Sequence, residues 1–428
     1  MRSGVPATTG DIPRLQAQRR ALIVLVTAQI LSGLGLAAGV TVGALLAQDV
    51  FGSTGLAGLP SAVGTAGAAL AAVAIGRLSQ ARGRRSGLAA GYLAGAAGSA
   101  GVIAGAVVGS AFLLLIALFV YGAGTAANLL ARYAGADLAA PAHRARAVSI
   151  VLVATALGGV AGPNLAAPFG DVAAALGVPE LAGPFLLSGA AYAVAAAVLA
   201  VWLRPDPLLL ARALDAEHGA ADSGDRPGDA ADPARRATVR RLPGVPVGAL
   251  VMVLTQLIMV AIMTMTPVHM RDHGHGTAAA GLVIALHIGA MYLASPLTGW
   301  LVDRYGRLTI AVASGPVLLI AGIVAATAPA GSVAAFSVAL ALLGLGWNFG
   351  LVAGTAIVAD AVPPDVRART QGMVDTAISV AGAAGGMLSG VVVAVAGYPL
   401  LAIGGGVLAA AVLAAVVMAA GVSAARSR

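Results

Sequence analysis

Long apolar runs dominate this chain, and a short polar stretch separates each run from the next. A helix needs about 20 consecutive apolar residues to cross a bilayer, and twelve runs have about that length. They lie near residues 21–47, 55–77, 86–108, 112–136, 147–169, 183–203, 247–270, 277–300, 308–328, 332–356, 370–394 and 399–421. The pattern predicts an all-α membrane protein with twelve transmembrane helices.

One segment interrupts this pattern between the sixth and seventh runs. Residues 204–246 are rich in Asp, Arg, Pro and Gly, a composition typical of disordered linkers. We therefore expect a largely disordered cytoplasmic linker between two six-helix bundles. The predicted parts are an N-terminal tail, the first bundle, the linker, the second bundle and a C-terminal tail, at residues 1–20, 21–203, 204–246, 247–421 and 422–428.

Arginines gather in one set of loops between the runs. This set holds Arg77, Arg82, Arg84, Arg85, Arg144, Arg146, Arg304, Arg307, Arg367 and Arg369. The alternate loops hold one arginine, Arg271. Cytoplasmic loops of membrane proteins carry the excess of basic residues, so the pattern places the arginine-rich loops and both termini in the cytoplasm. We expect a multi-pass protein of the cytoplasmic (inner) membrane.

Composition narrows the function classes. Residues are 59% hydrophobic and 10% charged, whereas soluble domains have about 25% charged residues. The net charge of +8 comes from loop arginines, which indicates membrane topology rather than nucleic-acid binding. The chain has no Cys and no Lys, so it has neither a thiolate metal site nor a P-loop lysine. We expect no enzyme activity and no permanently bound cofactor, and a monomer whose partners are the lipid bilayer and its substrate.

Two halves of the chain repeat at an offset of 223 residues. The segment GRLSQARGRR begins at Gly76, and GWLVDRYGRL begins at Gly299. A second pattern, Asp137-x6-Arg144-x-Arg146, recurs as Asp360-x6-Arg367-x-Arg369. One shared offset over separate loops predicts a duplicated six-helix unit.

The repeated loop resembles the signature G-x-x-x-D-R-x-G-R of the major facilitator superfamily. The second copy has every signature residue, namely Gly299, Asp303, Arg304, Gly306 and Arg307, whereas the first copy has Gln80 in place of the aspartate. This resemblance implies the major facilitator fold, in which two bundles rock around a central substrate site. It also implies that the charges of this loop, including Arg84 and Arg85, latch the cytoplasmic side in the outward-open state, more weakly in the copy without aspartate.

Two further charges lie inside the predicted helices. Arg132 is close to the cytoplasmic end of the fourth run, and Asp375 is close to the cytoplasmic start of the eleventh. Charges are costly in the bilayer and usually functional. We expect both in the cytoplasmic gate, with a proton-coupling role for Asp375 as the alternative.

Methionine and histidine gather on the seventh and eighth runs. Met259 and Met263 form one i, i+4 pair, and His287 and Met291 form another. Thioether and imidazole donors suit Cu(I), although methionine in an apolar helix is usually packing. The motifs M-x-x-x-M and H-x-x-x-M resemble those of the CcoA-like copper importers of the same superfamily, which implies that these four side chains bind the copper ion.

The hairpin between these runs carries three histidines, His269, His273 and His275. They are either solvated loop residues or an outer funnel that captures metal. From all these patterns we predict copper import, with a proton-coupled carrier of a small organic solute, vitamin or drug as the alternative. Riboflavin carriers occur in related branches, and a membrane metal sensor is the third class.

Overall fold

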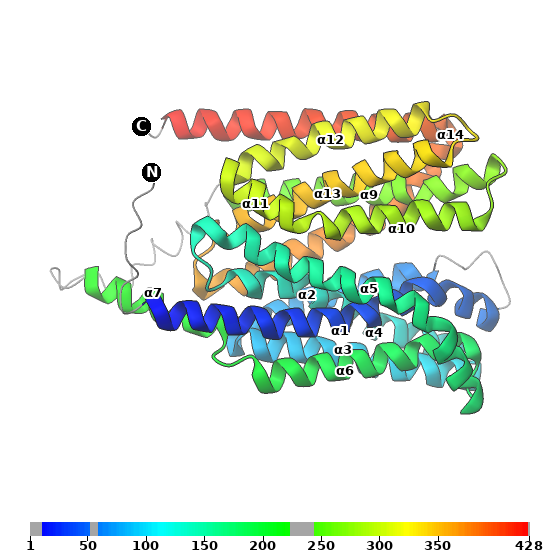
Figure 1. Ribbon diagram of the computed structural model, residues 1–428, viewed down its shortest axis with the longest axis horizontal. Coiled ribbons are helices and arrows are strands. Elements are labelled where there is room, and N and C mark those ends of the chain that lie inside the picture. Colours follow the sequence, from blue (N-terminus) through cyan, green and yellow to red (C-terminus); the bar gives the residue numbers. More distant parts are fainter. Residues whose placement is uncertain (1–10, 52–58, 223–243, 427–428) are drawn as a thin grey trace.

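The computed structural model describes residues 11–51, 59–222 and 244–426, and these residues form a helical bundle (Figure 1). The N-terminal half contains α1 (Asp11–Phe51), α2 (Leu59–Arg82), α3 (Arg84–Val108), α4 (Ala111–Ala136), α5 (Arg144–Ala175) and α6 (Gly183–Trp202). The C-terminal half contains α9 (Gly244–Asp272), α10 (Thr277–Leu293), α11 (Ser295–Tyr305), α12 (Arg307–Thr327), α13 (Val333–Ala361) and α14 (Pro364–Arg426). Helix α7 (Pro207–Asp222) follows the first half.

The described residues of each predicted run fall on one helix, a bent pair of helices or one part of α14. The eighth run covers α10 and α11, which meet at a bend of 40°, next to Pro296, whose ring removes a backbone donor. The last two runs both lie in α14, which turns at Gly397, where φ is 80°. Among the described residues, nine helices are long and apolar enough to cross a membrane, or ten with the bent pair. The prediction of an all-α membrane protein is confirmed.

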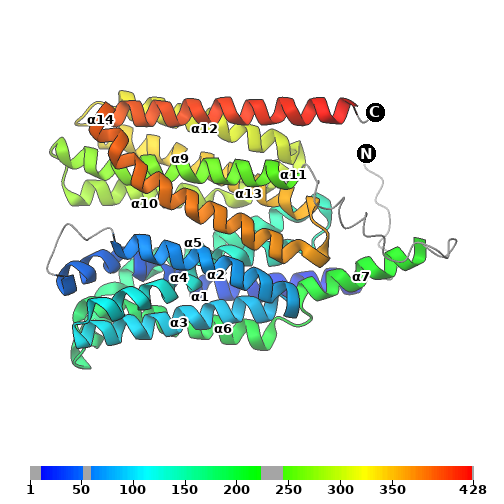
Figure 2. The ribbon, with the colours of Figure 1, turned by 180° about the vertical axis from the view of Figure 1, so that it is seen from behind.

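The two halves pack as separate bundles that lie side by side (Figures 1 and 2). One apolar core lies within the first half and includes Leu25, Tyr92 and Leu130. The other is centred on the second half and includes Leu340 and Trp347. Small residues bring the helices close together, as in other membrane bundles. The first described residue of α1 and the last of α14 lie at the same end of the molecule (Figure 1).

The predicted linker is partly folded, which corrects the expectation of a largely disordered segment. Residues 207–222 form α7. Its first turn is capped by Asp206, whose Oδ1 accepts hydrogen bonds from the backbone amides of Leu208 and Leu209 at 3.0 and 3.2 Å. Burial of Leu208 fixes the helix on the bundle. Residues 223–243 of the predicted linker lie outside the described residues.

The internal repeat is visible in the backbone of the signature loops. Gly83 and Gly306 occupy equivalent turns between helices and have φ angles of 89° and 98°, which only glycine adopts without strain. Gly76 and Gly299 also match: an added Cβ would lie 2.8 Å from the carbonyl of Ala368 at the first and 2.8 Å from the carbonyl of Ala145 at the second. Positions 145 and 368 are themselves 223 residues apart, so the same helix contact is built twice.

Candidate functional site

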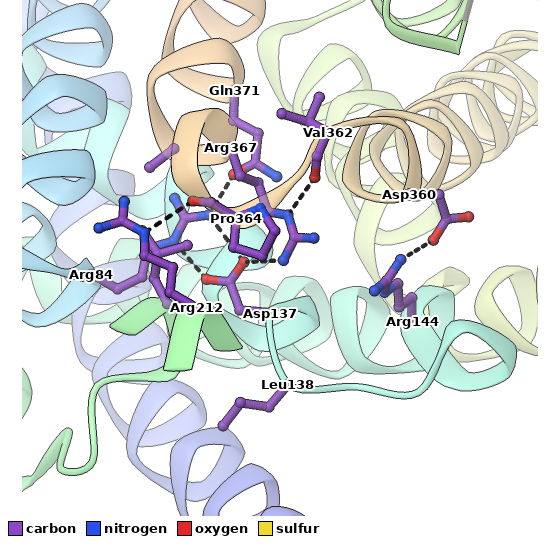
Figure 3. A network of polar contacts seen from close by, with 12 residues as sticks. Arg84, Asp137, Leu138, Arg144, Arg212, Asp360, Val362, Pro364, Arg367 and Gln371 are labelled. Carbon is purple, nitrogen blue, oxygen red and sulfur yellow. Dashed lines mark hydrogen bonds and ion pairs between the residues drawn. The ribbon is translucent and has the colours of Figure 1, made fainter. Parts of the chain in front are cut away.

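The two halves meet mainly along two helix pairs, α2 with α14 and α5 with α11. We call the end of the molecule with the loops after α2, α4, α11 and α13 the arginine-rich end. Figure 3 shows that polar side chains from both halves converge there. The signature residues and the repeated aspartates and arginines lie in this layer, so it is the first part of the candidate site.

Each repeated aspartate lies between an arginine of its own half and an arginine of the other half. The Asp137 carboxylate lies 2.8 Å from Nε of Arg84, in the same half, and 3.7 Å from Nη1 of Arg367, in the opposite half. Asp360 is placed equivalently: it is 2.6 Å from Nη1 of Arg307 and is paired with Arg144 of the first half. The repeat therefore builds two matching ion-pair clusters that hold the halves together. Figure 3 shows Asp137 with Arg84 and Arg367, and Asp360 with Arg144.

The signature aspartate binds a helix N-terminus. Asp303 accepts hydrogen bonds from the backbone amides of Ala145 and Arg146, at 3.2 and 3.1 Å, at the start of α5. Free amides and the helix dipole favour a carboxylate at this position. The Arg146 guanidinium is 3.9 Å away. Across the interface, Asp303 thus contacts mainly the backbone, and an arginine side chain only at longer range.

Gln80 occupies the same position in the first half. Its Oε1 accepts hydrogen bonds from the backbone amides of Ala368 and Arg369 at 2.8 and 3.3 Å, and its Nε2 donates to the carbonyl of Pro364 at 3.2 Å. The glutamine therefore reproduces the amide contacts of the aspartate without the charge. The relative strength of the two latches stays a prediction.

Other predicted gating residues have different roles. Arg307 also donates to the carbonyl of Pro141 at 2.7 Å. Arg304 is exposed beside the ring of Tyr305. At Arg85 the backbone amide donates to Asp206 at 2.8 Å, which ties the start of α3 to the segment before α7.

The close helix contact at Gly299 leads to the first prediction. A Cβ there would lie 2.4 Å from the Ser149 hydroxyl and 2.8 Å from the Ala145 carbonyl. Overpacking of this kind costs about 1–3 kcal/mol, so Gly299→Ala should separate α11 from α5 and favour opening of the arginine-rich end. Disulfide trapping between cysteines added to α5 and α11 measures this separation, with Gly281→Ala, where an added Cβ meets open space, as the control. Unchanged trapping would contradict the prediction.

A second cluster lies deeper in the bundle and joins α4 to α14. The Arg132 guanidinium makes a two-pronged contact with the Asp375 carboxylate, Nη2 to Oδ1 at 2.6 Å and Nη1 to Oδ2 at 2.9 Å. Tyr133 donates to the same carboxylate at 3.2 Å, and Arg132 Nε donates to the Thr355 hydroxyl at 3.0 Å. The side chains of the ion pair are 0% and 2% exposed, so this is a fully desolvated ion pair between the halves.

The repeat does not duplicate this pair. At the offset of 223 residues, Arg132 corresponds to Thr355, and Asp375 corresponds to Leu152. A buried ion pair is weak support for stability, because desolvation offsets much of the attraction. The pair therefore occurs at one of the two repeat-related positions across the interface, and stability alone does not account for it.

Neutral polar residues of the first half form a closed network. Gln29 Nε2 donates to the Asn128 carbonyl at 3.0 Å and to the Thr155 hydroxyl at 2.9 Å, and its Oε1 accepts from Tyr92. Asn128 in turn donates to Ser32 at 2.7 Å. These contacts link four helices, so Gln29 and Asn128 act as interhelical hydrogen-bonding residues.

Two similar contacts occur in the second half. Trp347 Nε1 donates to Gln256 at 2.6 Å. Asn348 donates to the Ser295 hydroxyl and to the Met291 carbonyl, both at 2.7 Å. The second contact fixes α13 against the bend between α10 and α11.

The predicted copper donors lie on two helices that pack on different faces of α13. Gly350 and Gly354 of α13 contact α9, which carries Met259 and Met263, whereas Gly344 contacts the backbone of α10 at His287 and Met291. Met259 and Met291 are buried, and Met263 is partly buried.

The His287 imidazole is completely buried beside α13. Its Nδ1 lies 2.8 Å from the carbonyl of Leu340. Its Nε2 is buried and has no hydrogen-bond partner among the described residues. The ring therefore has one nitrogen that could bind a further group.

The hairpin histidines contact neighbouring protein groups. The His269 ring stacks on Tyr398 with centroids 4.3 Å apart. His273 Nδ1 lies 2.8 Å from the His269 carbonyl, and His275 Nε2 lies 2.6 Å from the Ala330 carbonyl. Within residues 11–51, 59–222 and 244–426, no group of three or more His, Cys, Asp or Glu side chains could hold a metal ion.

Comparisons with known proteins agree on the family. The family model described as Major Facilitator Superfamily matches residues 25–285 and 248–427. The MFS-type transporter YdeG of Bacillus subtilis (strain 168) is 55% identical over 390 residues, which cover 91% of this chain and 89% of YdeG. The riboflavin transporter RfnT of Brucella anthropi is 32% identical over 367 residues, which cover 84% and 85% of the two chains.

Solved structures share the fold at lower identity. The proton:xylose symporter XylE superposes with a TM-score of 0.71 at 18% identity, covering 93% of this chain and 95% of XylE. The human organic anion transporter MFSD10 gives a TM-score of 0.70 at 17% identity, covering 92% and 99%. These values establish the fold of the two six-helix bundles.

Proposed function

Because this chain belongs to the Major Facilitator Superfamily, and is thus a membrane transporter rather than an enzyme, we propose that it is a proton-coupled carrier of a small organic solute. The substrate class is supported by the riboflavin transporter, which is 32% identical over 84% of this chain. Proton coupling is supported by the buried pair of Arg132 and Asp375. This is the single observation on which the mechanism depends.

We place the arginine-rich end in the cytoplasm, because basic residues concentrate on that side of membrane proteins. The clusters around Asp137 and Asp360 then form a closed cytoplasmic gate. In the alternating-access cycle, the gate must open so that the two halves separate at this end. Solute would bind from outside in the closed state and leave after the gate opens.

The carboxylate of Asp375 provides a proton switch for that opening. While it is ionised, it neutralises Arg132 across the interface between α4 and α14. A proton from the outside converts Asp375 to a neutral acid and weakens the contact that joins the halves. When the gate opens, water reaches the pair and the proton leaves to the cytoplasm. The ionised carboxylate then binds Arg132 again as the gate closes.

Purified protein in liposomes tests this proposal, with riboflavin as the first solute. An inward proton gradient should drive accumulation of riboflavin, and addition of riboflavin without a gradient should make the outer solution more alkaline. Arg132→Gln should reduce accumulation by about 100-fold, since it removes one partner of a buried pair. The exposed Arg82→Gln should retain it. Accumulation without proton movement would contradict the coupling proposal.

Copper import is a second candidate. The observation in its favour is the buried His287 ring, whose Nε2 has no partner among the described residues. Met259, Met263 and Met291 would supply the other donors, and copper would be the substrate. His287→Ala and Met263→Ala should each abolish uptake of radiolabelled copper, whereas Met387→Ala, at an exposed position, should have no effect. Unchanged copper uptake in the first two variants would exclude this candidate.

A further inference from the structure

A cavity of about 510 Å³ lies between the beginning of α1 and the beginning of α7. Arg14 and Arg20 line its α1 side, and Pro205, Leu210 and Leu214 line its α7 side. Figure 1 shows these two helices meeting at the arginine-rich end of the molecule. The cavity therefore combines two guanidinium groups with an apolar wall.

The two arginines of this cavity have no carboxylate partner among the residues that the structure describes. Arg14 Nε donates to the neutral carbonyl of Leu138 at 3.1 Å, and Arg20 is exposed. Among the described residues, neither arginine forms an ion pair. The neighbouring carboxylate of Asp206 accepts from the Arg85 amide and caps α7. An anion would supply the missing charge.

The cavity also lies at the level where the membrane begins. The apolar run of α1 begins at Ala21, directly after Arg20, so Arg20 lies at the predicted membrane boundary and Arg14 lies about 9 Å further out along the helix. Basic pockets at the cytoplasmic membrane surface bind anionic lipid headgroups. We propose that this cavity binds the headgroup of an anionic phospholipid, with its phosphate on Arg14 and Arg20 and its first methylene groups on Leu210 and Leu214. The orientation rests on the cytoplasmic placement proposed above.

A bound lipid would also act on the gate through α7. Arg212 of this helix donates to the Gln80 carbonyl at 2.7 Å and to the Pro364 carbonyl at 3.1 Å. Gln80 belongs to the first half and Pro364 to the second, so α7 bridges the halves. A lipid that holds α7 against α1 stabilises this bridge and the closed cytoplasmic gate.

Native mass spectrometry of the full chain, released from nanodiscs of phosphatidylcholine with or without phosphatidylglycerol, tests the site. The unchanged protein should retain phosphatidylglycerol in preference to phosphatidylcholine. Arg14→Gln with Arg20→Gln should reduce this retention roughly 10- to 30-fold, because each arginine that is removed weakens binding of an anionic lipid by up to about 5-fold. Arg77→Gln with Arg82→Gln removes the same charge at exposed positions and should retain the lipid.

Three results would overturn the proposal. Equal loss in both double variants would show a general charge effect, and equal retention of both lipids would show no headgroup preference. Equal binding of soluble glycerol phosphate would show an anion site without a role for the leucines. Thermal stabilisation of the unchanged protein by phosphatidylglycerol gives a second readout that needs no variant. Lipid retention is measured without transport, so its failure is distinct from failure of the carrier proposal.

Discussion

Replacing Asp375 with asparagine should shift the protein toward the state in which the arginine-rich end is open. The substitution leaves the Arg132 guanidinium buried without a counter-charge, at a cost of about 3–5 kcal/mol in the closed state. That cost lowers the ratio of closed to open molecules by about 10²- to 10³-fold. For comparison, a change of about 5.5 kcal/mol turns a 99:1 preference for the closed state into a 99:1 preference for the open state. In the open state, water can reach the guanidinium and most of the penalty is relieved.

The chain has no cysteine, which makes this shift easy to measure. Spin labels on cysteines introduced at Ala81 and Tyr305, exposed positions in opposite halves, report the separation across the arginine-rich end. Asp375→Asn should lengthen the measured distance. Asp365→Asn, at an exposed carboxylate on the same helix, should leave it unchanged.

A double substitution distinguishes the role of the ion pair in closing the gate from its role in coupling transport to protons. Arg132→Met with Asp375→Leu replaces the ion pair with apolar side chains, and Leu152 already occupies the position that corresponds to 375 in the first half. Such replacements of buried pairs are neutral or stabilising, so the distance should return to that of the closed state. Proton-driven accumulation should stay lost. A double variant that still couples transport to protons would show that Asp375 is not the proton switch.

The fold could be predicted from the sequence because the bilayer imposes a strong length constraint. Apolar runs of about 20 residues mark the helices directly, and the 223-residue offset identifies matching loops such as those at Gly83 and Gly306. The linker was harder to predict. Its charged and proline-rich composition conceals the short apolar segment after Asp206 that folds as α7 against the bundle.

The candidate site was predicted only in part, because sequence separation hides partners. Arg132 and Asp375 were both expected near the gate, but no pattern connects residues 243 positions apart to one ion pair. Similarly, the spacing of Met259 and His287 indicates a shared depth in the membrane. It does not reveal that α13 packs against both helices on different faces. In the sequence, Gln80 departs from the signature because it replaces the aspartate. In the structure, its side-chain amide group makes hydrogen bonds to the start of α14.

The duplicated clusters permit a last prediction, in which one half of the molecule is the control for the other. Asp137 and Asp360 are equivalent in the repeat, and each contacts one arginine from each half. Their burial differs: the Asp137 side chain is 1% exposed, and that of Asp360 is 24% exposed. Asparagine should therefore have unequal effects at the two positions, although the chemical change is the same.

Asp137→Asn leaves the buried Arg84 without its carboxylate and should destabilise the closed state by about 3–5 kcal/mol. Asp360→Asn removes a hydrated carboxylate and should cost about 1 kcal/mol or less. The spin-label distance between positions 81 and 305 measures both effects. Raising the salt concentration should weaken the Asp360 contribution more, because ions screen exposed pairs more than buried ones. Equal effects at the two positions would mean that repeat symmetry, rather than burial, determines the strength of the gate.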